Sequence, residues 1–122
     1  MFQITVEKSF HASHALKLPD GSLEPVHAHD WPVVVTVGAD SLDKMETVMD
    51  FHELERIVEH VIDPLRDLHL NDIDPYSHGM NPSAERVAEH IGHQIAADLP
   101  KRVKLVSVAL GEEVGCTAIY RP

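Results

Sequence analysis

The chain has 122 residues, of which 43% are hydrophobic and 25% charged, and its formal net charge is −10. This length predicts a single domain over residues 1–122, and the acidic balance excludes the basic surface that a nucleic-acid binder needs. The apolar runs are too short to span a membrane. We expect a cytoplasmic protein, because the N-terminus lacks a signal-peptide pattern and the single Cys116 cannot form an internal disulfide.

The first part of the chain predicts two strands separated by a loop. Residues 2–11 carry β-branched and aromatic side chains with partial alternation, and residues 29–40 form a second run of this type. Between them, Pro19-Asp20-Gly21-Ser22 and Pro25 supply the residues typical of turns.

Two helices are expected next. Asp50 is a candidate N-cap, with Glu53 placed to complete a capping box. Apolar residues follow at helical spacing: Leu54, Ile57, Val58, Val61, Ile62 and Leu65. A second helix is predicted to start with Asn81 as its cap and Pro82 at its first position, and to end at Pro100. Its apolar stripe is Ala84, Val87, Ala88, Ile91, Ile95 and Leu99.

The last part of the chain predicts two more strands, over residues 102–110 and 115–121, joined by a hairpin turn from Gly111 to Gly115. The order ββααββ indicates an α+β fold in which a four-stranded antiparallel sheet carries two helices on one face. The other face should present Val, Ile and Tyr from the second and fourth strands. We therefore expect another subunit to cover that face.

Three of the ten histidines form a candidate metal site. His27 and His29 are two residues apart in an extended segment, so their side chains point to the same face. His14 follows the first strand, which lies beside the second if the two form a hairpin. Three imidazoles suit zinc, which leaves a fourth position for water or substrate in catalytic sites. An H-x-H pair alone is equally compatible with an ordinary surface pair.

Six segments in order resemble the 6-pyruvoyltetrahydropterin and 6-carboxytetrahydropterin synthases. They are Phe10-His11-Ala12-Ser13-His14, His27-Ala28-His29-Asp30-Trp31, Thr47-Val48-Met49-Asp50-Phe51, Leu70-Asn71-Asp72, Asn81-Pro82-Ser83-Ala84-Glu85 and Glu112. The resemblance implies the T-fold, whose subunits' sheets join into a barrel in a homo-oligomer, expected to be a hexamer of two rings of three. It also implies one zinc ion on His14, His27 and His29, and a pterin held by the carboxylate of Glu112, with Glu85 as a second pterin contact.

The chain departs from the family's pattern at the residues that move protons. The synthases carry a catalytic cysteine where this chain has Leu23, and some members carry a glutamate there and cleave the pterin side chain. Here the glutamate is Glu24, one residue later. The family's Asp-His pair aligns with Arg66 and Asp67, and His69 lies two residues further on. The candidate catalytic residues are therefore Glu24, Asp67 and His69.

Three functions remain open from the sequence. The chain is a zinc-dependent lyase acting on dihydroneopterin triphosphate or a related pterin, a pterin-binding protein without turnover, or an oligomeric scaffold with structural histidines. Because a thiol base that contributes about 10²–10⁴-fold is missing, we expect the ordinary synthase reaction to be negligible.

Overall fold

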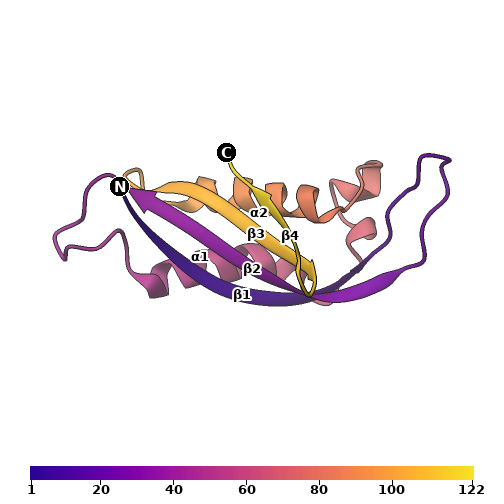
Figure 1. Ribbon diagram of the computed structural model, residues 1–122, viewed down its shortest axis with the longest axis horizontal. Coiled ribbons are helices and arrows are strands. Elements are labelled where there is room, and N and C mark those ends of the chain that lie inside the picture. Colours follow the sequence, from indigo (N-terminus) through magenta and orange to yellow (C-terminus); the bar gives the residue numbers. More distant parts are fainter.

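The protein is described here by a computed structural model that covers residues 1–122. Four strands form one antiparallel sheet in the order β1-β2-β3-β4, with both helices between β2 and β3 in the chain (Figure 1). The strands are β1 (Phe2–His14), β2 (His27–Ala39), β3 (Lys104–Glu113) and β4 (Cys116–Tyr120), and the helices are α1 (Phe51–Ile62) and α2 (Ala84–Asp98). Three short 3-10 turns separate the helices: η1 (Asp63–Leu65), η2 (Leu70–Asp72) and η3 (Tyr76–His78). The predicted ββααββ order is confirmed.

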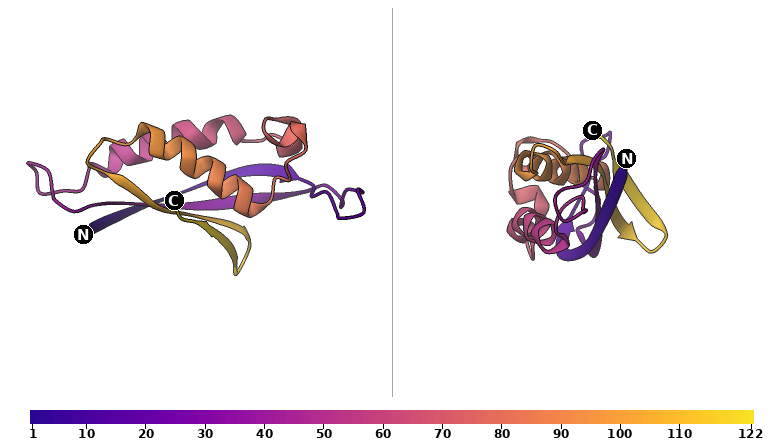
Figure 2. Two further views of the ribbon diagram at one scale, coloured as in Figure 1. Left: turned by 90° about the horizontal axis from the view of Figure 1, so that it is seen from above. Right: turned by 90° about the vertical axis from the view of Figure 1, so that its left-hand side faces the viewer.

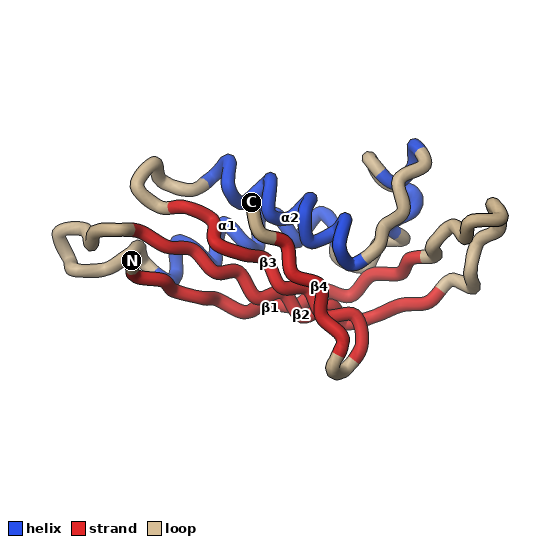
Figure 3. The backbone as a smooth tube through the Cα atoms, turned by 45° about the horizontal axis from the view of Figure 1, so that its top comes forward, coloured by secondary structure: helices blue, strands red, loops and turns tan.

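Both helices lie against the same face of the sheet, and the β3–β4 hairpin projects away from them (Figures 2 and 3). Alternate residues of the strands point toward the helices and form one buried apolar cluster with the helix stripes. Within this cluster, Phe10 on β1 lies opposite Trp31 on β2, and their rings stack at 6.1 Å. No helix is both long and apolar enough to span a bilayer.

Three predicted boundaries were wrong. The first strand continues to His14, which is therefore a strand residue. The helix α2 begins at Ala84, and its cap is Ser83, whose side chain accepts a hydrogen bond from Arg86 N, rather than Asn81. The last hairpin is tighter than expected, because β3 continues to Glu113 and leaves a two-residue turn before Cys116. The predicted cap of α1 is confirmed, since the Asp50 carboxylate accepts from His52 N.

The sheet face opposite the helices is more polar than the sequence suggested. The odd-numbered residues of β1 that point there are Gln3, Thr5, Glu7, Ser9, His11 and Ser13. Apolar contributions come from Val34 and from the exposed Ile119. Tyr120, which we expected on this face, instead packs against Gly92 of α2, and its hydroxyl lies 3.1 Å from His93 Nε2. The prediction for Tyr120 was therefore wrong.

The outer edge of β1 is covered along its second half. Asp67 N donates to the His11 carbonyl at 2.6 Å, and Ser13 N donates to the Leu68 carbonyl at 3.0 Å. Arg66 Nη1 donates to the Ser9 carbonyl at 3.0 Å. The segment after η1 thus fixes the end of β1 that carries His14.

Candidate metal centre

The pairing of β1 with β2 brings the three predicted histidines together. His14 lies directly opposite His27 in the ladder, and Ala12 lies opposite His29. Directly opposite side chains in an antiparallel pair are close neighbours, and a diagonal neighbour two residues away is still within reach of a long side chain. The His14 ring centroid is consequently 4.4 Å from that of His27 and 5.2 Å from that of His29.

A carboxylate from β3 joins the three histidines. Glu112 Oε1 lies 3.1 Å from His14 Nε2, 3.3 Å from His29 Nε2 and 3.7 Å from His27 Nε2. One ligand atom from each of the four residues lies within 4.8 Å of all the others. We call these four residues the His3Glu group. The sequence had placed Glu112 in a hairpin turn, whereas it belongs to the strand that pairs with β2.

The hydrogen bonds around the group direct lone pairs inward. His14 Nδ1 lies 2.8 Å from the Pro82 carbonyl, and His27 Nδ1 lies 2.9 Å from the Pro25 carbonyl. A carbonyl only accepts, so in the neutral imidazole each Nδ1 carries the proton and each Nε2 keeps its lone pair. His14 Nε2 and His29 Nε2 are buried without a hydrogen bond. With neutral imidazoles, nitrogen and oxygen lone pairs converge here, an arrangement that a cation satisfies.

The surroundings act differently on His29 and His27. The indole of Trp31 meets His14 and His29 edge to face, at centroid distances of 4.8 and 5.2 Å. Burial lowers the pKa of His29; the Glu112 carboxylate opposes this shift, and the neighbouring His14 and His27 add to it. The Pro25 carbonyl raises the pKa of the more exposed His27, with help from Glu24 and Glu112. Neutral imidazole is the form that binds a metal.

The loop before β2 places Glu24 beside the His3Glu group. Glu24 Oε1 lies 3.9 Å from His27 Nε2, and it accepts a hydrogen bond from Leu16 N at 2.9 Å. The neighbouring Leu23, which aligns with the synthases' cysteine, is 61% exposed. The one-residue offset in the sequence therefore does not keep the glutamate away from the histidines.

The other two catalytic candidates lie apart from the group. The His69 ring bonds to Ser13 Oγ at 2.9 Å, and Ser13 points to the sheet face opposite His14. The exposed Asp67 is tied to the β1 edge through its backbone and has a positive φ of 62°. Within one subunit, neither side chain is hydrogen-bonded or ion-paired to the His3Glu group.

Glu85 and Glu112 share a pocket of about 380 Å³ beside the histidines. Glu85 lies in the first turn of α2, and the opposite wall comes from the start of β4, including Cys116 and Thr117. The two predicted pterin contacts thus line one depression.

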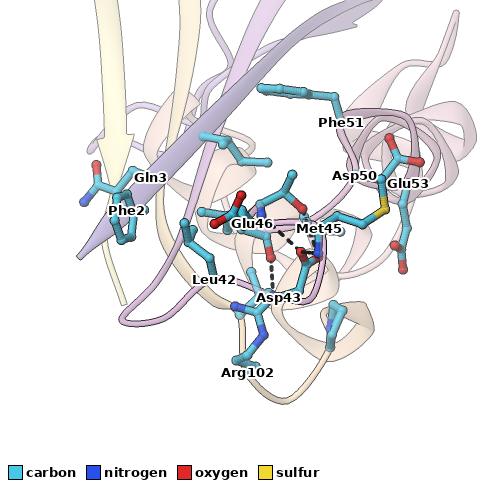
Figure 4. Close-up of a pocket in the computed structure, with 16 residues that line it drawn as sticks. Phe2, Gln3, Leu42, Asp43, Met45, Glu46, Asp50, Phe51, Glu53 and Arg102 are labelled. Atoms are coloured by element: carbon cyan, nitrogen blue, oxygen red, sulfur yellow. Dashed lines mark hydrogen bonds between the residues drawn. The ribbon is translucent and has the colours of Figure 1, made fainter.

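The largest pocket, of about 820 Å³, lies at the other end of the sheet (Figure 4). It is formed by the start of β1, the loop before α1 and the segment after α2, with Phe2, Met45, Phe51 and Arg102 among its lining residues. Figure 4 shows Arg102 beneath the loop, where it bonds to the carbonyls of Ser41 and Val48. β1 has thirteen residues, which at ~3.3 Å each separate this pocket from His14 by roughly 40 Å.

Comparison with known proteins supports one family. The family model described as 6-pyruvoyl tetrahydropterin synthase matches residues 3–122. A dihydroneopterin monophosphate aldolase of Pyrococcus furiosus is 34% identical over 110 residues, which span 90% of this chain and 89% of that protein. A 6-carboxy-5,6,7,8-tetrahydropterin synthase of Haemophilus influenzae is 36% identical over 76 residues, covering 59% of this chain and 54% of the synthase.

Solved structures share the fold at low sequence identity. The 6-pyruvoyl tetrahydropterin synthase of Caenorhabditis elegans superposes with a TM-score of 0.80 at 18% identity, covering 100% of this chain and 97% of that chain. The corresponding Plasmodium vivax synthase gives a TM-score of 0.79 at 16% identity, covering 99% and 97%. The predicted T-fold is confirmed, and the chain belongs to the 6-pyruvoyl tetrahydropterin synthase family.

Proposed function

We propose that the protein is a metal-dependent lyase that cleaves the side chain of a dihydroneopterin phosphate, with Glu24 as the base. The observation that carries this proposal is the Glu24 carboxylate, 3.9 Å from His27 Nε2, beside the exposed Leu23. The relative that matches 90% of the chain is an aldolase acting on a dihydroneopterin monophosphate. A carboxylate base without a thiol agrees better with carbon–carbon cleavage than with the synthase reaction.

The proposed reaction is a retro-aldol cleavage. Glu24 takes the proton from the hydroxyl on the second side-chain carbon, and the bond between the first and second carbons breaks. A carbonyl forms on the departing fragment, while the electron pair passes into the ring imine that adjoins the first carbon. The proton is then returned to the first carbon, which leaves a hydroxymethyl pterin and a phosphorylated glycolaldehyde.

The donor set fits zinc. Three neutral imidazoles are a common zinc ligand set, and His14, His27 and His29 offer their Nε2 atoms with Nδ1 of the first two already tied to carbonyls. A zinc ion held there would supply Lewis-acid charge for the side-chain oxygens. In this proposal Glu112, which lines the pocket together with Glu85, accepts from the amino-imino edge of the pterin ring.

One observation favours a second candidate, a structural metal site without turnover. Glu112 Oε1 lies within 3.1–3.7 Å of all three histidine Nε2 atoms, which is where a fourth protein ligand would lie. A zinc site closed by four protein ligands is typical of structural zinc, whereas catalytic sites keep one position open. The role of Glu112 therefore separates the two candidates.

The metal assignment predicts one divalent ion per chain. Replacing His27 by alanine should remove stoichiometric binding, because two imidazoles alone hold zinc much more weakly. The matched control is His52→Ala on the surface of α1, which should bind as much metal as the parent. Elemental analysis after zinc reconstitution measures both, and equal metal in the His27 variant would contradict the assignment.

The base assignment predicts that Glu24→Gln lowers kcat for release of the aldehyde from dihydroneopterin monophosphate by about 10²–10⁴-fold. The amide keeps the shape but cannot take a proton. Leu23→Ala, one residue away, should keep the activity within about twofold, since its side chain is exposed. A coupled assay of the aldehyde measures both variants. Full activity in Glu24→Gln, or loss of activity only in Cys116→Ser, would assign the base elsewhere.

The anchor role predicts that Glu112→Gln weakens pterin binding by about 1–3 kcal/mol, because the amide turns a donor toward the donors of the ring. Glu113→Gln is the neighbouring control and should leave the affinity unchanged. Fluorescence titration with a pterin, with metal content measured on the same samples, gives the answer. Loss of metal with unchanged pterin affinity in the Glu112 variant would favour the closed four-ligand site.

We also propose a hexameric homo-oligomer built from two rings of three. The sheet has an uncovered face and an open β4 edge, and the family resemblance implies subunits whose sheets join into a barrel. Light scattering should give a mass of six times the 13.6 kDa chain. A monomeric mass would contradict this assembly.

A further inference from the structure

The loop that carries Glu24 is attached to the rest of the protein by two asparagine side chains. Asn71 Oδ1 accepts from Ala15 N at 2.9 Å, and its Nδ2 donates to the Ala15 carbonyl at 2.7 Å. Asn81 does the same at Lys17, with distances of 2.7 Å and 3.0 Å. These are the only two asparagines in the chain. Each side-chain amide bonds both the N–H and the C=O of one residue, as a residue of a neighbouring antiparallel strand does.

Leu16, between the two attached residues, points its backbone groups the other way. Leu16 N donates to Glu24 Oε1 at 2.9 Å, and the Leu16 carbonyl accepts from Glu24 N at 3.0 Å. This alternation follows from an extended backbone, in which successive residues direct their polar groups to opposite edges. Residues 15–17 therefore form a short bridge, with the asparagines on one edge and Glu24 on the other.

The backbone segments that carry the two asparagines adjoin the core and the His3Glu group. Asn71 lies in η2 next to Leu70, which is fully buried. Asn81 precedes Pro82, whose carbonyl bonds to His14 Nδ1 at 2.8 Å. The same irregular segment thus fixes the orientation of a proposed metal ligand and, through residues 15–17, the position of the Glu24 carboxylate.

We propose that Asn71 and Asn81 are positioning residues that hold Glu24 at the metal centre through the backbone of residues 15–17. This inference rests on the proposed function of Glu24 as the base. The remainder of the loop offers little alternative support, since Leu18, Leu23 and Val26 are all exposed. A displacement of about 1 Å at a catalytic group can cost about 10²-fold in rate. The hydrogen bonds of the two asparagines should therefore affect kcat through the position of Glu24.

The first test needs no activity. Amide hydrogen exchange is measured at Leu16, whose N–H bonds to Glu24 and touches neither asparagine. We expect Asn71→Ala and Asn81→Ala each to accelerate exchange at Leu16 by at least about tenfold, approaching the effect of Glu24→Ala. The double variant Asn81→Ala/Glu24→Ala should accelerate exchange at Leu16 by less than the two single variants combined. Unchanged protection of Leu16 in both asparagine variants would overturn the proposal.

The second test uses the zinc-loaded protein and dihydroneopterin monophosphate. Asn71→Ala and Asn81→Ala should lower kcat by about 10–100-fold, with KM within about threefold and metal content equal to that of the parent. Ser77→Ala is the control. It removes the Ser77–Asp74 hydrogen bond from the segment between α1 and α2, which also carries both asparagines, and it does not contact residues 15–17. Faster exchange at Leu16 with an unchanged kcat, or a loss of metal, would contradict a positioning role. A parent without activity would reject the proposed function, and the exchange measurement would still decide the attachment.

Discussion

The register between β1 and β2 is the constraint on which the site depends. It places His14 opposite His27 and leaves His29 on the diagonal, and a shift of one residue would turn every side chain of one strand to the other face. The apolar residues further along the same ladder hold this register, because Phe10 and Trp31 are paired and buried on the helix side. Core packing and the placement of the candidate metal ligands are therefore specified by one set of backbone hydrogen bonds.

The His3Glu group brings polar atoms into a buried position, where unpaired polar atoms are energetically unfavourable. His14 is fully buried, and its Nε2 has no hydrogen-bond partner although Glu112 Oε1 is 3.1 Å away. Desolvated lone pairs cost free energy unless something compensates them. A divalent cation compensates several of them at once, so the cost in the metal-free protein is itself an argument for binding. The buried Trp31 indole packs edge to face against His14 and His29 on the inner side of the group.

The sequence predicted the order of the elements and the identity of the three histidines, because apolar periodicity and the H-x-H spacing are local properties. It did not predict that Glu112 meets the histidines, since this depends on how far β3 runs along β2. It also could not show that Glu24 rather than Leu23 turns inward, which depends on hydrogen bonds to Leu16. The cap of α2 was misplaced because Asn81, a suitable cap, bonds to Lys17 instead.

The segment that covers the second half of β1 also has a consequence for solubility. An exposed strand edge is a template on which other chains can aggregate. Arg66, Asp67 and Leu68 occupy the outward backbone groups of Ser9, His11 and Ser13, so a foreign strand has only the first part of β1 on which to pair. The β1 edge is thereby shielded next to the candidate metal ligands, and on this edge strand addition is confined to the first part of β1, where the exposed Glu7 places a charge that disfavours unselective pairing.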